Sequence, residues 1–161
     1  MDMLVPLYRL PMAREEAVGG LELAHGIKVR HVYAFELSLL RDFVERHFRG
    51  GWADEVEMGF RHMPPSVLIA IKEGKIVGFA GYDCTFNGFF GPTGVEEAYR
   101  KKGIGKALLI ASMWELKALG YAYAVVGSVS TSEFYAKSIG ATPIEGSTPG
   151  AYLDMLKRPA V

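Results

Sequence analysis

The stretch Arg100-Lys101-Lys102-Gly103-Ile104-Gly105-Lys106 opens the longest predicted helix of the chain, residues 103–119. The first turn of a helix has free backbone N–H groups and a partial positive charge, and both attract anions. Glycines remove the side chains that would keep a phosphate away from the backbone, and the basic residues before Gly103 add charge. The stretch therefore predicts a diphosphate-binding turn. A plain tight turn with a solvated basic rim fits the same residues.

Two other phosphate-binding motifs do not fit this stretch. A dinucleotide-binding Gly-x-Gly-x-x-Gly run would need glycine at position 108, which is Leu108. A P-loop would need Ser or Thr after Gly105-Lys106 and glycine at position 100, where the chain has Ala107 and Arg100. The turn is therefore expected to bind its anion in another kind of fold.

Apolar spacing predicts the elements on either side of the turn. Period-two alternation and short apolar runs indicate strands, and apolar residues three to four apart indicate helices. We expect strands over residues 4–10, 27–33, 67–71, 76–80, 121–129, 141–144 and 151–156, another strand after Asn87-Gly88, and helices over residues 37–48, 52–63, 103–119 and 131–138. Gly91-Pro92 predicts a bulge or a break in strand pairing. Helices that interrupt a mostly antiparallel set of strands indicate an α/β fold, with a mixed sheet flanked by helices.

Composition excludes several classes of protein. The chain has 161 residues, half of them hydrophobic, which suits one domain with a sizeable core. Eighteen basic residues balance eighteen acidic ones, so no nucleic-acid partner is expected. The single cysteine, Cys84, is expected to be a small buried hydrophobe. The four histidines have no metal-ligand spacing, and no secretory signal or membrane-spanning run is evident. We expect a cytoplasmic protein without a metal or a membrane partner.

A second motif lies downstream in Glu133-Phe134-Tyr135-Ala136-Lys137-Ser138-Ile139-Gly140-Ala141. Together with Arg100-x-x-Gly103-x-Gly105, it resembles the coenzyme A motif and the following short helix of the GCN5-related N-acetyltransferases (the GNAT family), with Ala141 where that family has Phe. The resemblance extends from residue 27 to residue 156. It implies a GNAT-like fold in residues 27–161, with residues 1–26 as an N-terminal extension packed on that domain.

The resemblance implies direct transfer of the acetyl group of acetyl-CoA to an amine. The strand around Gly94 and Val95 would separate from its neighbour and pair with the pantetheine arm, and the Val95 N–H would polarise the thioester carbonyl. Tyr135 would protonate the departing thiolate, because a phenol with a pKa of about 10 stays protonated at neutral pH. A ring that only packs is the alternative for Tyr135. The implied cofactor-binding residues are Gly94, Val95, Arg100, Lys101, Lys102, Gly103, Ile104, Gly105, Lys106, Ser128, Phe134 and Tyr135.

The sequence leaves the general base and the acceptor open. Asp83 is the first candidate for a general base, and the others are Glu36, Glu55 and Glu57. The two early helices shape the acceptor pocket in the family, so the residues expected to line it are Trp52, Glu55 and Phe60. The acceptor stays open between a small amine, an amino sugar and a protein amine, and a homodimer stays open too. Two rival hypotheses are a non-catalytic acyl-CoA sensor and an interaction domain that binds no coenzyme A.

Overall fold

Residues 1–160 are described in the computed structural model of the chain, which contains one seven-stranded sheet in the order β2-β3-β4-β5-β6-β1-β7. The strands are β1 (Met3–Pro6), β2 (Lys28–His31), β3 (Val67–Lys72), β4 (Lys75–Tyr82), β5 (Phe89–Val95), β6 (Tyr123–Val126) and β7 (Thr142–Pro143). The helices are α1 (Arg14–His25), α2 (Leu37–His47), α3 (Trp52–Glu57), α4 (Ile104–Ala118) and α5 (Ser132–Ile139). Only the β5–β6 pair is parallel among the paired strands of the described chain. The mixed, mostly antiparallel α/β fold predicted from the sequence is confirmed.

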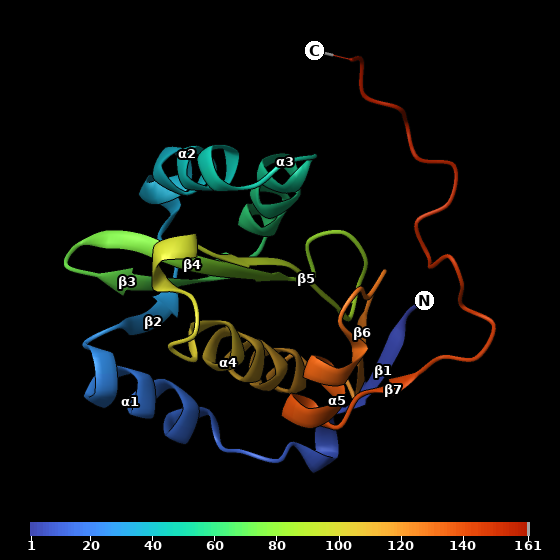
Figure 1. Cartoon of the computed structure of the whole chain (residues 1–161), viewed down its shortest axis with the longest axis horizontal. Coiled ribbons are helices and arrows are strands. Elements are labelled where there is room, and N and C mark those ends of the chain that lie inside the picture. Colours follow the sequence, from blue (N-terminus) through green and yellow to red (C-terminus); the bar gives the residue numbers. More distant parts are fainter. Residues whose placement is uncertain (161) are drawn as a thin grey trace.

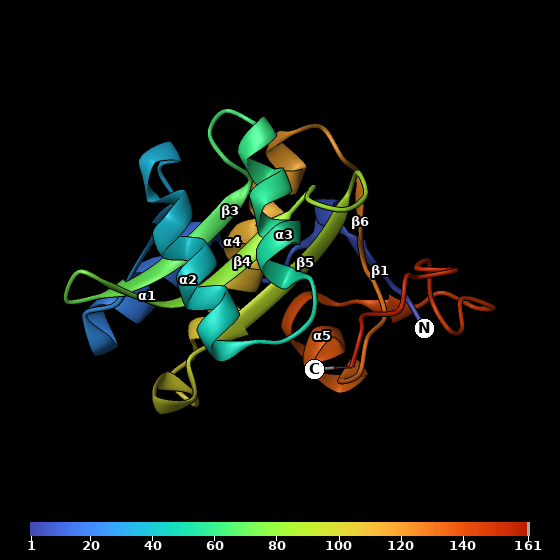
Figure 2. The same cartoon turned by 90° about the horizontal axis from the view of Figure 1, so that it is seen from above.

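Helices cover both faces of the sheet. Helices α2 and α3 lie on one face, and α1, α4 and α5 lie on the other (Figure 1). Helix α4 is apolar on nearly every side because it packs against β3, β4 and β5 and is covered by α1. Figure 2 shows α2 and α3 crossing above the central strands. The sheet therefore separates a large core around α4 from a smaller one under α2 and α3, in which Cys84 is buried as predicted.

Strand β5 carries the irregularity predicted at Gly91-Pro92. Ala80 pairs with Thr93 and Tyr82 pairs with Phe90, so two residues of β5 stand opposite one residue of β4. This arrangement is a β-bulge, which bends the strand that contains the extra residue. On its other side, β5 pairs with β6 only at Phe89 and Phe90. Beyond Phe90 the two strands separate, and no strand of the described residues pairs with this edge of β5.

The N-terminal segment contributes to the sheet itself. Strand β1 pairs with both β6 and β7, and α1 packs on α4, where the Trp114 indole N–H donates to the carbonyl of Met12 at 2.9 Å. The predicted strand 4–10 is shorter, because a 3-10 turn over Leu7–Arg9 follows β1. Residues 1–26 are thus a strand and a covering helix of the same sheet, and the domain division at residue 26 stays a prediction.

The strand predicted over residues 151–156 is wrong. These residues form no strand and run away from the sheet toward the C-terminus (Figure 1). Leu156 is 95% exposed and Leu153 is 67% exposed. The Leu153 N–H donates to the Ala151 carbonyl within the segment and not to a neighbouring strand, and the exposed leucines gain nothing from burial.

Candidate functional site

The turn before α4 leaves its backbone N–H groups free for a ligand. Gly103 is the N-cap residue of α4 with φ +86°, and no side chain within residues 1–160 caps the helix by a hydrogen bond. Lys101 also has a positive φ of 66°, so the turn bends sharply just before the helix begins. The side chains of Lys101, Lys102 and Lys106 are exposed around this turn. Free N–H groups, a helix start and three ammonium groups are the features from which the sequence predicts an anion site, and the structure brings them together at this turn.

The turn lies against the end of β5. A Cβ added at Gly105 would meet Val95 Cγ2 at 3.8 Å, and the Arg100 Nε donates to the Val95 carbonyl at 3.2 Å. Arg100 therefore fixes the turn to the strand, and its exposed guanidinium is adjacent to the predicted phosphate position. The structure brings the predicted turn and the predicted strand residues Gly94 and Val95 together.

The orientation of Val95 follows from the strand pairing. The Glu96 N–H donates to the Val77 carbonyl at 2.9 Å, so the backbone groups of Glu96 point toward β4. Successive residues of an antiparallel strand point these groups to opposite sides. The N–H of Val95 therefore points away from β4, toward the edge that β6 has left. This free donor is aimed into the opening between β5 and β6.

Tyr135 of α5 stands near the point where β5 and β6 separate. Its ring lies 6.4 Å from that of Phe90, the last residue of β5 that pairs with β6. Burial raises the pKa of Tyr135 above its usual value. Phe134 lies 5.2 Å from Tyr135, ring to ring, and is 40% exposed. Tyr135 is thus a half-buried, protonated phenol beside the opening.

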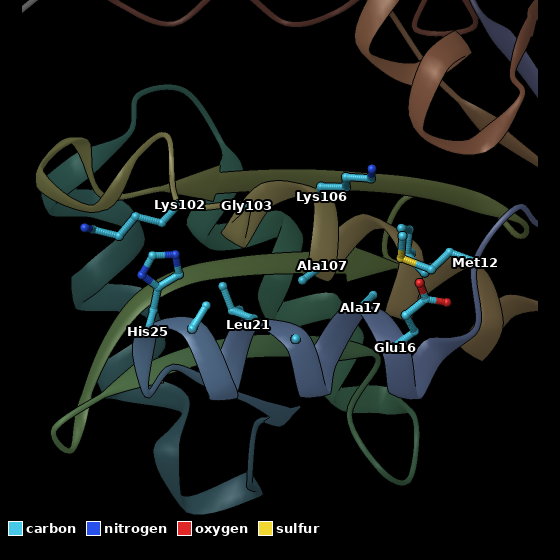
Figure 3. A pocket seen from close by; sticks show the side chains of 12 residues that line it. Met12, Glu16, Ala17, Leu21, His25, Lys102, Gly103, Lys106 and Ala107 are labelled. Carbon is cyan, nitrogen blue, oxygen red and sulfur yellow. The ribbon is translucent and has the colours of Figure 1, made fainter.

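A hollow of about 220 Å³ lies between α1 and the first half of α4 (Figure 3). Figure 3 shows Lys102 beside His25 at one end of it and Glu16 beside Met12 at the other. Its lining is largely apolar and includes Leu21, Ala107 and Ile110. The hollow continues directly from the predicted anion site, because Lys102, Gly103 and Lys106 line both. The sequence did not reveal it, since α1 has no motif that places it beside α4.

The three predicted acceptor-site residues lie on the α2–α3 face. Trp52 stacks on Phe48 with ring centroids 5.5 Å apart, and Phe60 packs on the smaller core. Glu55 accepts a hydrogen bond from the Thr85 hydroxyl. Within residues 1–160, Glu55 makes no ion pair, so its carboxylate is free to meet a cation.

Phe48 is a residue of this face that the sequence did not single out for the site. A Cβ added at Gly94 would lie 2.3 Å from Phe48 Cζ, so the ring rests directly on the β5 backbone. Glycine is required at position 94 for this close approach. The helical spacing of residues 37–48 marks Phe48 only as core. The contact with Gly94 depends on tertiary structure that the spacing does not contain.

Of the predicted candidate bases, three have partners that occupy their carboxylates. Asp83 is 4% exposed, and its oxygens accept from the Gly88 N–H at 2.6 Å and from the Tyr121 hydroxyl at 3.1 Å. Glu36 forms two hydrogen bonds with Arg30, which hold its pKa below the usual value, and Glu57 pairs with Arg41 at 3.0 Å. The geometry favours structural roles for these three carboxylates.

Ser128 lies just after β6, on the other strand of the opening. Its N–H donates to Asp2 Oδ1 at 2.9 Å. The backbone amide is therefore occupied within the protein, and the side-chain contact with coenzyme A that the resemblance implies stays a prediction.

No group of three or more metal-ligating side chains occurs in the described part of the chain, and none of its helices is long and apolar enough to cross a membrane. The site is thus defined by one strand edge, one helix start and two flanking faces.

Residues 64–138 match the family model described as "Acetyltransferase (GNAT) domain", and no curated protein matches the chain. A solved structure of the glucosamine N-acetyltransferase region of a fungal multi-domain GH3 β-N-acetylglucosaminidase is 16% identical, with a TM-score of 0.68 over 85% of this chain and 19% of that chain. A GCN5-related N-acetyltransferase from Sphaerobacter thermophilus is 23% identical, with a TM-score of 0.60 over 78% and 40%. A GNAT acetyltransferase from Brucella melitensis, solved with acetyl-CoA, is 19% identical, with a TM-score of 0.51 over 68% and 82%.

These structural likenesses show the fold, and the chain spans less than half of the first two proteins. The matched segment contains β3, β4, β5, α4 and β6 and most of α5, which includes every element of the opening. Residues 64–138 therefore match a GNAT acetyltransferase domain, and the fold that surrounds them is similar to that of the solved GNAT structures, in agreement with the resemblance.

Proposed function

We propose that this chain is an acetyl-CoA-dependent N-acetyltransferase. The observation that carries the proposal is the edge of β5 beyond Phe90, which is free of β6 and leads directly to the uncapped start of α4. An extended arm with amide groups can pair with such an edge, and a diphosphate can bind the helix start. The Brucella melitensis protein was solved with acetyl-CoA and the Escherichia coli protein YhbS with CoA, which supports the choice of donor.

In this proposal, the N–H groups of residues 101–106 hold the pyrophosphate and the open edge of β5 holds the pantetheine arm. The N–H of Val95 donates to the thioester oxygen and stabilises the negative charge that develops there. The adenosine end lies in the hollow between α1 and α4. Its base contacts the apolar lining, and Lys102 pairs with the 3′-phosphate.

Tyr135 is the proposed general acid. Its pKa is raised by burial, so its hydroxyl keeps its proton at neutral pH and can donate that proton to the departing thiolate. Its ring lies 6.4 Å from that of Phe90 and 5.2 Å from that of Phe134, beside the opening. The proton that the phenol gives up is replaced from the proton lost by the amine during the reaction, through solvent or a carboxylate.

Glu55 is the proposed acceptor-side base, in preference to Asp83. The carboxylate of Asp83 is buried and occupied by two hydrogen bonds, whereas Glu55 has no cationic partner in the described chain. A carboxylate in that position attracts an ammonium group and can take its proton. Trp52 and Phe60 supply apolar surface on the same face. The cytoplasmic location and the homodimer stay predictions.

Two measurements test the function. We expect acetyl-CoA to raise the melting temperature, since a ligand that binds only the folded state stabilises it by about 2.7 kcal/mol at 100 times its Kd. We also expect thiol release when a primary amine is added. A thermal shift without thiol release from any amine would support the sensor hypothesis. The interaction-domain hypothesis requires that acetyl-CoA cause no thermal shift.

A further inference from the structure

Two tyrosines flank the point where β5 leaves β6, one on each face of the sheet. Phe89 and Phe90 are neighbours in a strand, so their rings point to opposite faces. Tyr135 lies 6.4 Å from Phe90, ring to ring, on the α5 face. Tyr152 lies 6.2 Å from Phe89, ring to ring, and therefore belongs to the α3 face. The second phenol comes from the C-terminal segment, to which the proposed function assigns no role.

Tyr152 is seated closely against both separating strands. It stacks on Phe86 with ring centroids 5.6 Å apart and planes 9° apart. A Cβ added at Gly127, the residue directly after β6, would meet the Tyr152 hydroxyl and Cε2 at 3.1 Å. The ring thus fills the space between Phe89 of β5 and Gly127 beyond β6. That space is where the opening begins.

The segment that holds Tyr152 is anchored to Asp2. The Asp2 N–H donates to Ser147 Oγ at 2.8 Å, and the Ile144 N–H donates to the Asp2 carbonyl at 2.9 Å. A Cβ added at Gly150 would lie 3.1 Å from Asp2 Oδ1, so the segment packs closely there. These contacts fix residues 144–150 over the end of β1. Tyr152 follows two residues after this segment, so the contacts with Asp2 also determine where Tyr152 lies.

Glu55 lies on the same side of the opening as Tyr152. Its carboxylate accepts from Thr85, the residue before Phe86, whose ring stacks on Tyr152. Burial, together with the carboxylates of Glu55 and Asp2, raises the pKa of Tyr152 to about 12. The phenol therefore stays neutral over the working pH range. A neutral phenol oxygen and a carboxylate without a cationic partner, beside aromatic rings, can bind the ammonium group of a small molecule.

We propose that Tyr152 and Glu55 form the site that binds the acceptor amine. This proposal rests on the proposed function. The acceptor is then a small primary amine that enters from the α3 face. Glu55 pairs with the ammonium, and the Tyr152 oxygen accepts one of its hydrogen bonds. Tyr152 is a positioning residue that orients the amine toward the thioester. Tyr135 serves the leaving thiol from the opposite face of the sheet.

The test measures thiol release by the full chain with acetyl-CoA and four amines: ethanolamine, 1,4-diaminobutane, glucosamine and phenethylamine. In Tyr152→Phe, we expect the KM for the amine to rise about tenfold, the loss typical of one hydrogen bond to a charged group, while the KM for acetyl-CoA is unchanged. Gly127→Ala keeps the Tyr152 phenol but displaces it, because the added methyl group meets its ring. The KM for the amine should again rise while the KM for acetyl-CoA is unchanged. Tyr8→Phe is the control, because Tyr8 is exposed on the 3-10 turn after β1.

The outcomes separate this inference from the proposed function. An unchanged amine KM in Tyr152→Phe, or equal rises in both KM values, would overturn the acceptor site. A thermal shift with acetyl-CoA but no acetylation of any of the four amines would also overturn it, and would leave the donor site standing. The absence of any shift with acetyl-CoA would instead refute the proposed function itself.

Discussion

Gly94 is the position where a single methyl group should disturb the site most measurably. Its added Cβ would lie 2.3, 2.5 and 2.9 Å from three carbons of the Phe48 ring. The ring cannot simply move aside, because it packs 5.5 Å from both Trp52 and Phe79, ring to ring. Overpacking of this kind costs about 1–3 kcal/mol. For a chain of this length, Gly94→Ala should lower the melting temperature by about 2–12 °C.

The assay is thermal or urea unfolding of Gly94→Ala, Phe48→Leu and the double variant. The smaller side chain in Phe48→Leu makes room for the methyl group, so the double variant should recover about 1 kcal/mol or more as coupling energy. Gly19→Ala is the matched control, because a Cβ at Gly19 meets nothing within 4 Å. If Gly94→Ala were as stable as the wild type, or lost the same stability with Leu at position 48, the contact would be refuted. Since Val95 adjoins Gly94, acetyl-CoA affinity should fall in parallel.

Three further substitutions test Tyr135, Lys102 and Glu115. Tyr135→Phe should lower kcat and leave the Kd for CoA unchanged, and an unchanged kcat would remove Tyr135 from the mechanism. Lys102→Ala should weaken the binding of acetyl-CoA but not the binding of its 3′-dephospho analogue. Equal losses of affinity for both ligands in titration calorimetry would place the 3′-phosphate elsewhere. The pKa of Glu115 is lowered from 4.5, mainly by the hydrogen bond from His31. A carboxyl whose pKa is lower in the folded state stabilises the fold at any pH above its unfolded-state pKa. This stabilisation is lost as the pH falls through the folded-state pKa. Glu115→Gln should therefore be less stable than the wild type near neutral pH, and the difference in the free energy of unfolding should shrink below pH 4.5. A difference in urea unfolding that does not depend on pH would contradict this role of Glu115.

Much of the fold could be predicted because its signals are local. The helical spacing of residues 37–48, the turn after residue 72 and the glycine after α5 each specify structure within a few residues. The bulge at Gly91-Pro92 was predictable for the same reason, since proline cannot donate to a strand ladder. The strand predicted over residues 151–156 was wrong because strand pairing depends on the path of the segment relative to distant strands, which its own sequence does not specify.

The donor side of the site was predictable for related reasons, whereas the acceptor side was not. Residues 100–106 lie in one continuous stretch, so the sequence shows the helix start, the glycines and the basic residues together, and a plain tight turn is the alternative that the same residues leave open. Phe48 over Gly94 and Tyr152 over Gly127 are contacts between residues far apart in sequence, and neither has a motif. Asp83 was the first candidate base because of its position at a strand end. Its two hydrogen bonds become visible only when the loop and Tyr121 are in place.

Titration of acetyl-CoA into the wild type and Gly105→Asp is the most direct test of a donor site at the start of α4. A Cβ at Gly105 meets only Val95 at 3.8 Å, and an acidic residue at a helix start is favourable, so this variant should fold as stably as the wild type. Its carboxylate would occupy and repel the anion site. We predict saturable binding of one acetyl-CoA per chain in the wild type and none in Gly105→Asp. Equal binding by both proteins, or none by the wild type, would contradict a donor site at the start of α4.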